Sequence, residues 1–345
     1  MDLSIAAILS LDGLTNGAIY ALVALALVLV FAVTRVVFIP QGEFVAFGAL
    51  TMAVLQSGGV PGMVWLVLLL AALAALMDGW RARQERWPLP RFLRQVLSHT
   101  AVPLLAAGLT LAFAASKPPV IVQALLTLGL VTPLGPLLYR VVYQSLAASS
   151  VLVLLIVSVG VHFALTGLGL LFFGAEGFRN PPFWSERFAL GPLSLTGQAL
   201  IVILATFVLI FVLFQFLDRT LTGKALRATA VNRDGARLMG ISTDASGSLC
   251  FSLAAFIGAL SGLLIGPTTT MYYDSGFLIG LKGFVAAVFA GLQSFPLALA
   301  GAIGVGLLES FGSFWASAFK EVIVFTAILP VLLWRSFVDP HHEEH

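Results

Sequence analysis

Four ionisable side chains lie within or at the ends of apolar runs, and they are the residues of this sequence that could do chemistry: Glu43, His162, Lys282 and Glu309. A charge at the centre of a bilayer costs about 3 kcal/mol, so it has to face protein or water rather than lipid. We expect Glu43 either to close the start of a helix, where a negative charge suits the helix dipole, or to serve a transport path or its gate. Lys282 either extends to the membrane surface, pairs with Asp274 or lines a vestibule.

Glu309 and His162 carry weaker functional signals. Glu309 precedes Lys320 and Glu321 near an expected outer turn, which favours a plain charge at the membrane interface. His162 stands in the middle of the apolar run 150–173, where its own helix offers no acidic neighbour for a proton relay. We therefore expect it to hydrogen-bond a neighbouring helix. No cluster has the spacing of a nucleophile with its base, or of a metal site.

The sequence excludes several other kinds of chemistry. Its only Gly-Lys pair, Gly223-Lys224, is followed by Ala225 and lacks the upstream glycine, so there is no G-x-x-x-x-G-K-[ST] phosphate loop. The single cysteine, Cys250, excludes an intrachain disulfide and a cysteine-based metal site. The histidines of 341–345 are interpreted as part of a solvated tail. We expect no catalytic residue, no metal and no cofactor in this chain.

A basic, polar segment at 219–241 separates two apolar runs, and a membrane protein seldom structures such a connection unless another molecule binds it. Thr222 is placed to cap a helix, Gly235 to divide it and Gly240 to end it in a left-handed conformation. Helical spacing puts Ala228, Val231, Gly235 and Leu238 on one face, and Thr229, Arg233 and Arg237 on the other. We interpret the segment as a docking element.

The composition requires membrane helices to position these residues. Of 345 residues, 59% are apolar and 10% charged, and the mean hydropathy is +1.03; a soluble domain carries about a quarter charged residues. Backbone in lipid has to be satisfied within helices, so the expected fold class is all-α, a polytopic transmembrane helix bundle. Eleven apolar segments are expected, at 17–38, 42–57, 61–77, 101–116, 119–138, 150–173, 196–217, 246–266, 277–292, 297–313 and 320–336.

Three of these segments, 42–57, 277–292 and 297–313, are shorter than the roughly 20 residues of a straight crossing. Some of them are expected to be half-helices or re-entrant pieces. Three glycines at GxxxG spacing, Gly258, Gly262 and Gly266, indicate close packing of helices.

Basic residues set the orientation, because they collect on the cytoplasmic side. Alternation through eleven segments puts thirteen of the eighteen basic residues on one side, which predicts the N-terminus outside and the C-terminus inside. The thirteen are Arg35, Arg81, Arg83, Arg86, Arg91, Arg94, Arg140, Arg219, Lys224, Arg227, Arg233, Arg237 and Arg335. The other five are Lys117, Arg179, Arg187, Lys282 and Lys320.

The docking segment and three further regions together resemble the H-type permease subunit of branched-chain amino acid ABC importers. In the segment the resemblance rests on residues 223–230, Asn232 and 236–241. The further regions are Asn16-Gly17 with 20–22, Leu25, 41–44 and Gly48-Ala49; 276–286 with Gly291-Leu292; and 306–310 with Lys320-Glu321. Together they cover most of 13–56 and 139–336, within a single membrane domain, 1–345.

The resemblance implies one half of a permease in the bacterial inner membrane, surrounded by lipid. Its partners would be a second homologous permease subunit, two cytoplasmic ATPases that use ATP and Mg, and an extracytoplasmic substrate-binding protein, with no nucleic acid. The cytoplasmic loop 218–245 would dock the ATPases through Gly223, Lys224, Ala225, Leu226, Arg227, Ala228, Asn232, Arg237, Leu238, Gly240 and Ile241. For the translocation path we expect Asn16, Gln41, Gly42, Glu43, Phe44, Gly280, Lys282 and Phe284.

The sequence departs from the family pattern in three places. The residues 38–41 read Phe-Ile-Pro-Gln where Asn-Phe-Ala-His is usual, and Gly235 stands where Ala is commoner. The span 78–138 resembles an insertion with a cytoplasmic arginine-rich loop, attracted to anionic head groups, and two extra helices. Rival hypotheses are the same machine with urea, a short amide or another small solute as cargo, an ion-coupled secondary carrier with inverted repeats, and a non-transporting scaffold.

Overall fold

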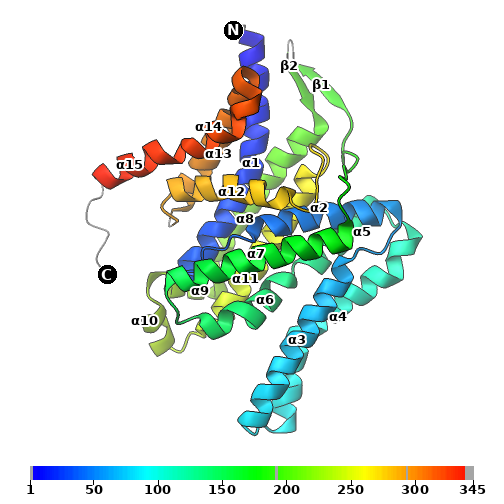
Figure 1. Ribbon diagram of the computed structural model, residues 1–345, viewed down its shortest axis with the longest axis vertical. Helices are drawn as coiled ribbons and strands as arrows, with labels where there is room; N and C mark the ends of the chain where they lie inside the picture. The colour runs from blue at the N-terminus through cyan, green and yellow to red at the C-terminus, as the bar shows by residue number, and fades with distance from the viewer. Residues whose placement is uncertain (1–2, 191–192, 293, 339–345) are drawn as a thin grey trace.

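The apolar runs of the sequence form helices throughout the computed structural model, which describes residues 3–190, 193–292 and 294–338 (Figure 1). The helices are α1 (Leu3–Thr34), α2 (Gln41–Ser57), α3 (Met63–Gln84), α4 (Leu89–Phe113), α5 (Val120–Val131), α6 (Leu134–Leu138), α7 (Val151–Phe173), α8 (Gly197–Arg219), α9 (Leu221–Val231), α10 (Arg233–Leu238), α11 (Thr243–Ile265), α12 (Ser275–Phe289), α13 (Phe295–Ala316), α14 (Lys320–Thr326) and α15 (Ile328–Val338). The predicted all-α class is confirmed.

One small sheet was not expected. In the outer loop, β1 (Arg187–Leu190) pairs antiparallel with β2 (Leu193–Thr196). The hairpin closes on Thr196, whose side chain accepts a hydrogen bond from the Ala199 amide and so starts α8. The strands therefore serve to bring the chain back to the membrane.

Eight helical segments of the described chain are long and apolar enough to cross a membrane. The segments 42–57 and 277–292 are short, as predicted, because α2 has 17 residues and α12 has 15. The prediction that 297–313 is short is wrong, since α13 runs on to Ala316 over 22 residues. The last segment, 320–336, is split into α14 and α15.

The arginine-rich loop of the span 78–138 is mostly helical. Helices α3 and α4 pack against each other well beyond their apolar runs, so Arg81 and Arg83 belong to α3, and Arg91 and Arg94 to α4. Arg86, in the short turn between them, has a positive φ of 49°. In Figure 1 this turn lies at the lower end of the molecule.

Helix α1 is the centre of the bundle and contacts α8, α9, α11, α12 and α13. Its closest partner is α13, where a Cβ added at Gly306 would collide with the backbone of Gly13 and Gly17. Likewise, a Cβ at Gly262 of α11 would collide with the Val45 carbonyl of α2. The close packing predicted from glycine spacing is thus present.

The two ends of the molecule carry different connections. In Figure 1, α10 and the α3–α4 turn lie in the lower half of the molecule, and the start of α1 and the β1–β2 hairpin lie at the upper end. The two main clusters of basic residues therefore share one side, as alternation requires. The predicted side of the C-terminus concerns residues 339–345, which lie outside the described residues.

Candidate functional site

The polar segment between α8 and α11 forms two short helices, each started by a capping side chain. The hydroxyl of Thr220 accepts a hydrogen bond from the Gly223 amide at 3.0 Å, so Thr220 rather than Thr222 starts α9. The side chain of Asn232 accepts from the Gly235 amide at 2.8 Å. The division between α9 and α10 thus falls at Asn232 and not at Gly235, because Asn232 adopts an extended conformation and caps the next turn.

Helix α9 is fixed to the membrane body through one face. A Cβ at Gly223 would collide with the end of α8, which makes glycine necessary there. Leu226 is buried on the same face. The Thr229 hydroxyl donates to the Ser246 hydroxyl of α11 at 3.3 Å, and Arg233 of α10 donates to the Ala147 carbonyl at 2.9 Å. Helix α9 is therefore in contact with both α8 and α11.

The outward face of the segment is apolar and basic. Leu221, Val231, Leu238 and Met239 are between 83% and 88% exposed, which is unusual for four large apolar side chains on a polar connection. We call these four residues, with the exposed Lys224, Arg227 and Arg237, the docking surface. Leu221, Val231 and Met239 were missing from the predicted docking residues.

Of the residues expected to dock a partner, most are exposed and four are not. Lys224, Arg227, Ala228, Asn232, Arg237, Leu238 and Gly240 are exposed. Gly223 and Leu226 are buried, and Ala225 and Ile241 are half-buried. Gly240 ends α10 with a φ of 81°, the left-handed conformation predicted for it. The buried pair holds the helix in place and cannot contact a partner.

The predicted path residues 41–44 form the first turn of α2, buried against α11 and α12. Gln41 donates to the Ala254 carbonyl of α11 at 3.0 Å. Gly42 packs on Gly276 and Gly280 of α12, where a Cβ on Gly42 would collide with the Gly276 carbonyl. Phe44 lies with its ring 5.5 Å from that of Phe38. The structure thus brings Gly42 and Gly280 together.

Glu43 faces a histidine from another helix. The His162 Nδ1 atom of α7 lies 2.9 Å from Glu43 Oε1, and both side chains are buried. The angles leave both Glu43 oxygens without a hydrogen-bond partner among the described residues. The His162 ring lies 4.8 Å from that of Phe277. His162 was expected to hydrogen-bond a neighbouring helix. Its Nδ1 atom lies beside Glu43 of α2 but makes no hydrogen bond among the described residues.

Lys282 belongs to a second buried cluster. Its Nζ lies 2.5 Å from Glu309 Oε1 and 3.3 Å from Glu321 Oε1. The Tyr20 hydroxyl donates to Glu309 Oε2 at 2.5 Å. The prediction of Glu309 as a plain interfacial charge is wrong: it is 9% exposed and joins α13 to α1 and α12. Lys282 pairs with Glu309 rather than with Asp274.

A cavity of about 1020 Å³ opens beside the Lys282 cluster, between α1, α13 and the outer loop. Asn16, the outermost residue of the predicted path, lines it. Its charged lining has both signs, with Asp12 and Glu309 on one hand and Arg179, Arg187 and Lys320 on the other. The outer cavity therefore suits a small ligand with a positive and a negative group.

The remaining path residues do not line this cavity. Gly280 and Phe284 border a void of about 10 Å³ beside Phe38, the size of a single water. Glu43 lines neither space. The predicted path is thus divided into separate buried clusters, and its residues form no continuous opening within the described chain.

Comparison with known proteins gives a consistent result. A family model described as the permease component of branched-chain amino acid transport systems matches residues 95–333. The high-affinity branched-chain amino acid transport permease BraD of Pseudomonas aeruginosa is 26% identical over 331 residues, covering 94% of this chain and 92% of that protein. LivH of Escherichia coli, with the same description, is 30% identical over 201 residues, 56% of this chain and 65% of that protein.

A more distant similarity extends to an archaeal protein. The probable branched-chain amino acid permease LivH of Methanocaldococcus jannaschii is 32% identical over 130 residues, 36% of this chain and 41% of that protein. No solved structure matches the chain.

Proposed function

The chain belongs to the permease family of branched-chain amino acid transport systems, and on that basis we propose that it is the permease subunit of an ATP-driven importer of branched-chain or other apolar amino acids. It is a multi-pass membrane protein, which we assign to the bacterial inner membrane. The observation that carries the proposal is the docking surface, four exposed apolar side chains among exposed arginines on the two short helices α9 and α10.

In this proposal the energy comes from partner subunits. Two cytoplasmic ATPases, which bind ATP and Mg, contact the docking surface, and this chain itself binds no nucleotide. When the ATPases close, they push on α9. The push reaches α8 through Gly223 and α11 through the contact of Thr229 with Ser246. Helix α1 contacts α8, α9 and α11, so it moves with them.

The outer cavity supports an amino acid as cargo. A free amino acid carries an ammonium and a carboxylate, and the cavity lining supplies charges of both signs. Urea and short amides are neutral and gain little from such a lining. An extracytoplasmic binding protein would release the amino acid above this cavity, and a second homologous permease subunit would complete the path.

The proposal is tested by uptake of labelled leucine into vesicles that hold the permease pair and the ATPases. Uptake is expected to require ATP hydrolysis. Arg227→Glu with Arg237→Glu should reduce both uptake and co-purification of the ATPases at least tenfold, a loss of about 1.4 kcal/mol of binding. The matched control is Arg83→Glu with Arg94→Glu, which reverses two exposed arginines of the α3–α4 hairpin on the same side.

Two results would contradict the proposal. One is uptake that continues when the ATPases are omitted. The other is uptake that an uncoupler abolishes at constant ATP, which would make the protein an ion-coupled carrier. Unchanged co-purification of the docking variant would overturn the assignment of the docking surface alone.

A further inference from the structure

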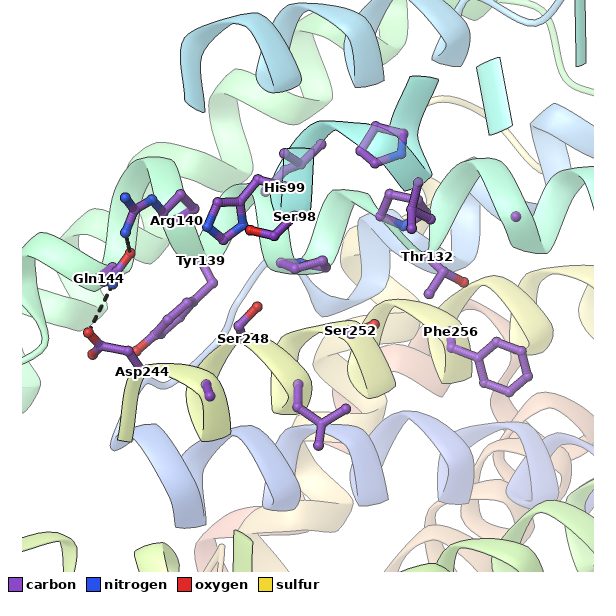
Figure 2. Close-up of a pocket in the computed structure, with 18 of the residues that line it drawn as sticks. Ser98, His99, Thr132, Tyr139, Arg140, Gln144, Asp244, Ser248, Ser252 and Phe256 are labelled. Carbon is purple, nitrogen blue, oxygen red and sulfur yellow. Dashed lines mark hydrogen bonds between the residues drawn. The ribbon is translucent and has the colours of Figure 1, made fainter. Parts of the chain in front are cut away.

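A cavity of about 970 Å³ lies away from the predicted path and the outer cavity, between α4, the α5–α6 region and α11 (Figure 2). We call it the inner groove. Its walls come from helical segments long and apolar enough to cross a membrane. One wall is α4, part of the inserted span 78–138 for which the proposed function gives no role.

The inner groove has a polar end and an apolar end. Figure 2 shows Tyr139, Arg140, Gln144 and Asp244 gathered at one end, and Phe256 at the other. The polar end is the one nearest the docking surface in sequence, because Asp244 lies in the first turn of α11, the helix that comes after α10. Ser98 and His99 of α4 lie between the two ends. A polar end and an apolar end in one groove suit an amphipathic ligand.

Two buried donors at the polar end lack a partner within the described chain. The Tyr139 hydroxyl, on a side chain only 2% exposed, makes no hydrogen bond. Arg140 is 5% exposed; its terminal nitrogens bind Asp78 and Gln144, but its Nε has no partner. Leaving a buried donor unpaired costs about 1–3 kcal/mol, so acceptor atoms of a ligand are expected here.

The local backbone is unusual at the same place. Residues Tyr139–Tyr143 form a π-helical turn after α6, and such turns occur frequently at functional sites. Tyr139 and Arg140 are consecutive residues of this turn, and both line the groove. This arrangement suits an anionic group with several oxygens, of which phosphate is the most common in a membrane.

A carboxylate stands beside these donors. Asp244 is exposed and accepts one hydrogen bond, from the Gln144 side chain at 3.0 Å. Gln144 in turn accepts from Arg140, so one side chain separates Asp244 from Arg140. The polar end therefore offers donors for a phosphate and an acceptor for an ammonium. A phospholipid with a primary amine in its head group carries both a phosphate and an ammonium, and a two-carbon linker separates them.

We propose that the inner groove binds an aminophospholipid of the cytoplasmic leaflet. Tyr139 and Arg140 bind its phosphate, Asp244 binds its ammonium, and an acyl chain lies along Val102, Leu128 and Phe256. Basic groups between membrane helices on this side are suited to lipid head groups. The span 78–138 then has a role, because α4 closes the groove against α11. This inference does not depend on which cargo the permease carries.

The test fills the groove without touching its polar end. Gly129 lines the groove, and a Cβ added there meets nothing within 4 Å, so Gly129→Leu can be accommodated and occupies the acyl-chain space. The control is Gly160→Leu on α7, which also faces open space but lies outside the groove. Both proteins are placed in nanodiscs of phosphatidylethanolamine, phosphatidylcholine or phosphatidylglycerol, and retained lipid is measured by native mass spectrometry.

Wild type and Gly160→Leu are expected to retain phosphatidylethanolamine, and Gly129→Leu about tenfold less. Tyr139→Phe, which removes only the unpaired hydroxyl, should weaken retention of all three lipids. Asp244→Asn should remove the preference for phosphatidylethanolamine over phosphatidylcholine, because the quaternary amine of choline has no N–H to donate.

Equal lipid retention by Gly129→Leu and Gly160→Leu would overturn the proposal. So would displacement of the lipid by millimolar inorganic phosphate, which would make the groove a phosphate site. Loss of the second permease subunit from Gly129→Leu, with no change in retained lipid, would show that a protein helix occupies the groove instead.

Discussion

At the scale of residues, the buried charges of this protein form ion pairs and hydrogen bonds between helices. Lys282 of α12 binds Glu309 of α13 and Glu321 of α14, and Tyr20 of α1 donates to Glu309. A charge in such a place is stable only when its partner is present, because desolvation is costly for each ion alone. The cluster therefore joins four helices beside the outer cavity.

We predict that Lys282→Met lowers the free energy of unfolding by about 3 kcal/mol, because Glu309 is left buried without a cation. Adding Glu309→Gln to Lys282→Met should recover most of that loss. Unfolding in detergent, followed by helical circular dichroism, measures both. Lys224→Met, which removes an exposed lysine, is the control and should change little. If Lys282→Met alone is as stable as the wild type, the ion pair of Lys282 with Glu309 contributes nothing to the free energy of unfolding.

The sequence singled out both members of each buried pair but did not show which residue pairs with which. Glu43 and Lys282 were recognisable because a charge inside an apolar run is costly and so is seldom accidental. Their partners, His162 and Glu309, lie on other helices, and which helix faces turn toward each other is decided by packing across the whole bundle. Glu309 was misjudged for this reason, since its neighbours in sequence suggested a surface.

At the scale of elements, glycines set how closely the helices approach. Gly306 and Gly304 stand two residues apart on α13 and face different surroundings. A Cβ at Gly306 would collide with Gly13 and Gly17 of α1, whereas one at Gly304 meets nothing within 4 Å. The two positions therefore form a matched pair.

We predict that Gly306→Leu destabilises the bundle by about 2 kcal/mol, the usual cost of forcing a larger side chain into a packed site. Gly304→Leu should stay within about 0.5 kcal/mol of wild type, as for most surface changes. Thermal unfolding of the two purified variants in one detergent compares them directly. Similar unfolding temperatures would mean that α1 and α13 separate in solution.

The helices themselves were predictable, and their ends only in part. Apolar runs located the segments because helices satisfy the backbone in lipid. The starts of α9 and α10 were assigned to the wrong residues, Thr222 and Gly235, because several polar residues there can cap equally well. The structure selects Thr220 and Asn232, since Gly223 has to lie against α8. The β1–β2 hairpin had no periodic signal in its turn-rich loop.

At the scale of the whole molecule, the chain has two faces across the membrane. The docking surface and the α3–α4 turn lie at one end and the β1–β2 hairpin at the other. Composition was sufficient to predict a membrane bundle, and the orientation predicted from the arginines stays a prediction. The cargo could not be predicted in this way, because the charges that line the outer cavity come from segments far apart in the sequence.

We predict that Leu238→Cys reacts with a membrane-impermeant maleimide only after cells are opened, whereas Ser185→Cys in the outer loop reacts in intact cells. Both positions are exposed. The natural Cys250 is fully buried and is the only cysteine in the sequence, so it should give no background signal. Labelling of Leu238→Cys in intact cells would reverse the orientation and remove the ATPases from the docking surface.

The pairing of α1 with α13 also has a consequence for how the protein is made. Helix α1 is synthesised long before α13, the helix that covers Gly13 and Gly17. During most of translation the glycine face of α1 must therefore be held by lipid or by the insertion machinery. Chains that stop before residue 295 should expose that face, and we expect cells to degrade them.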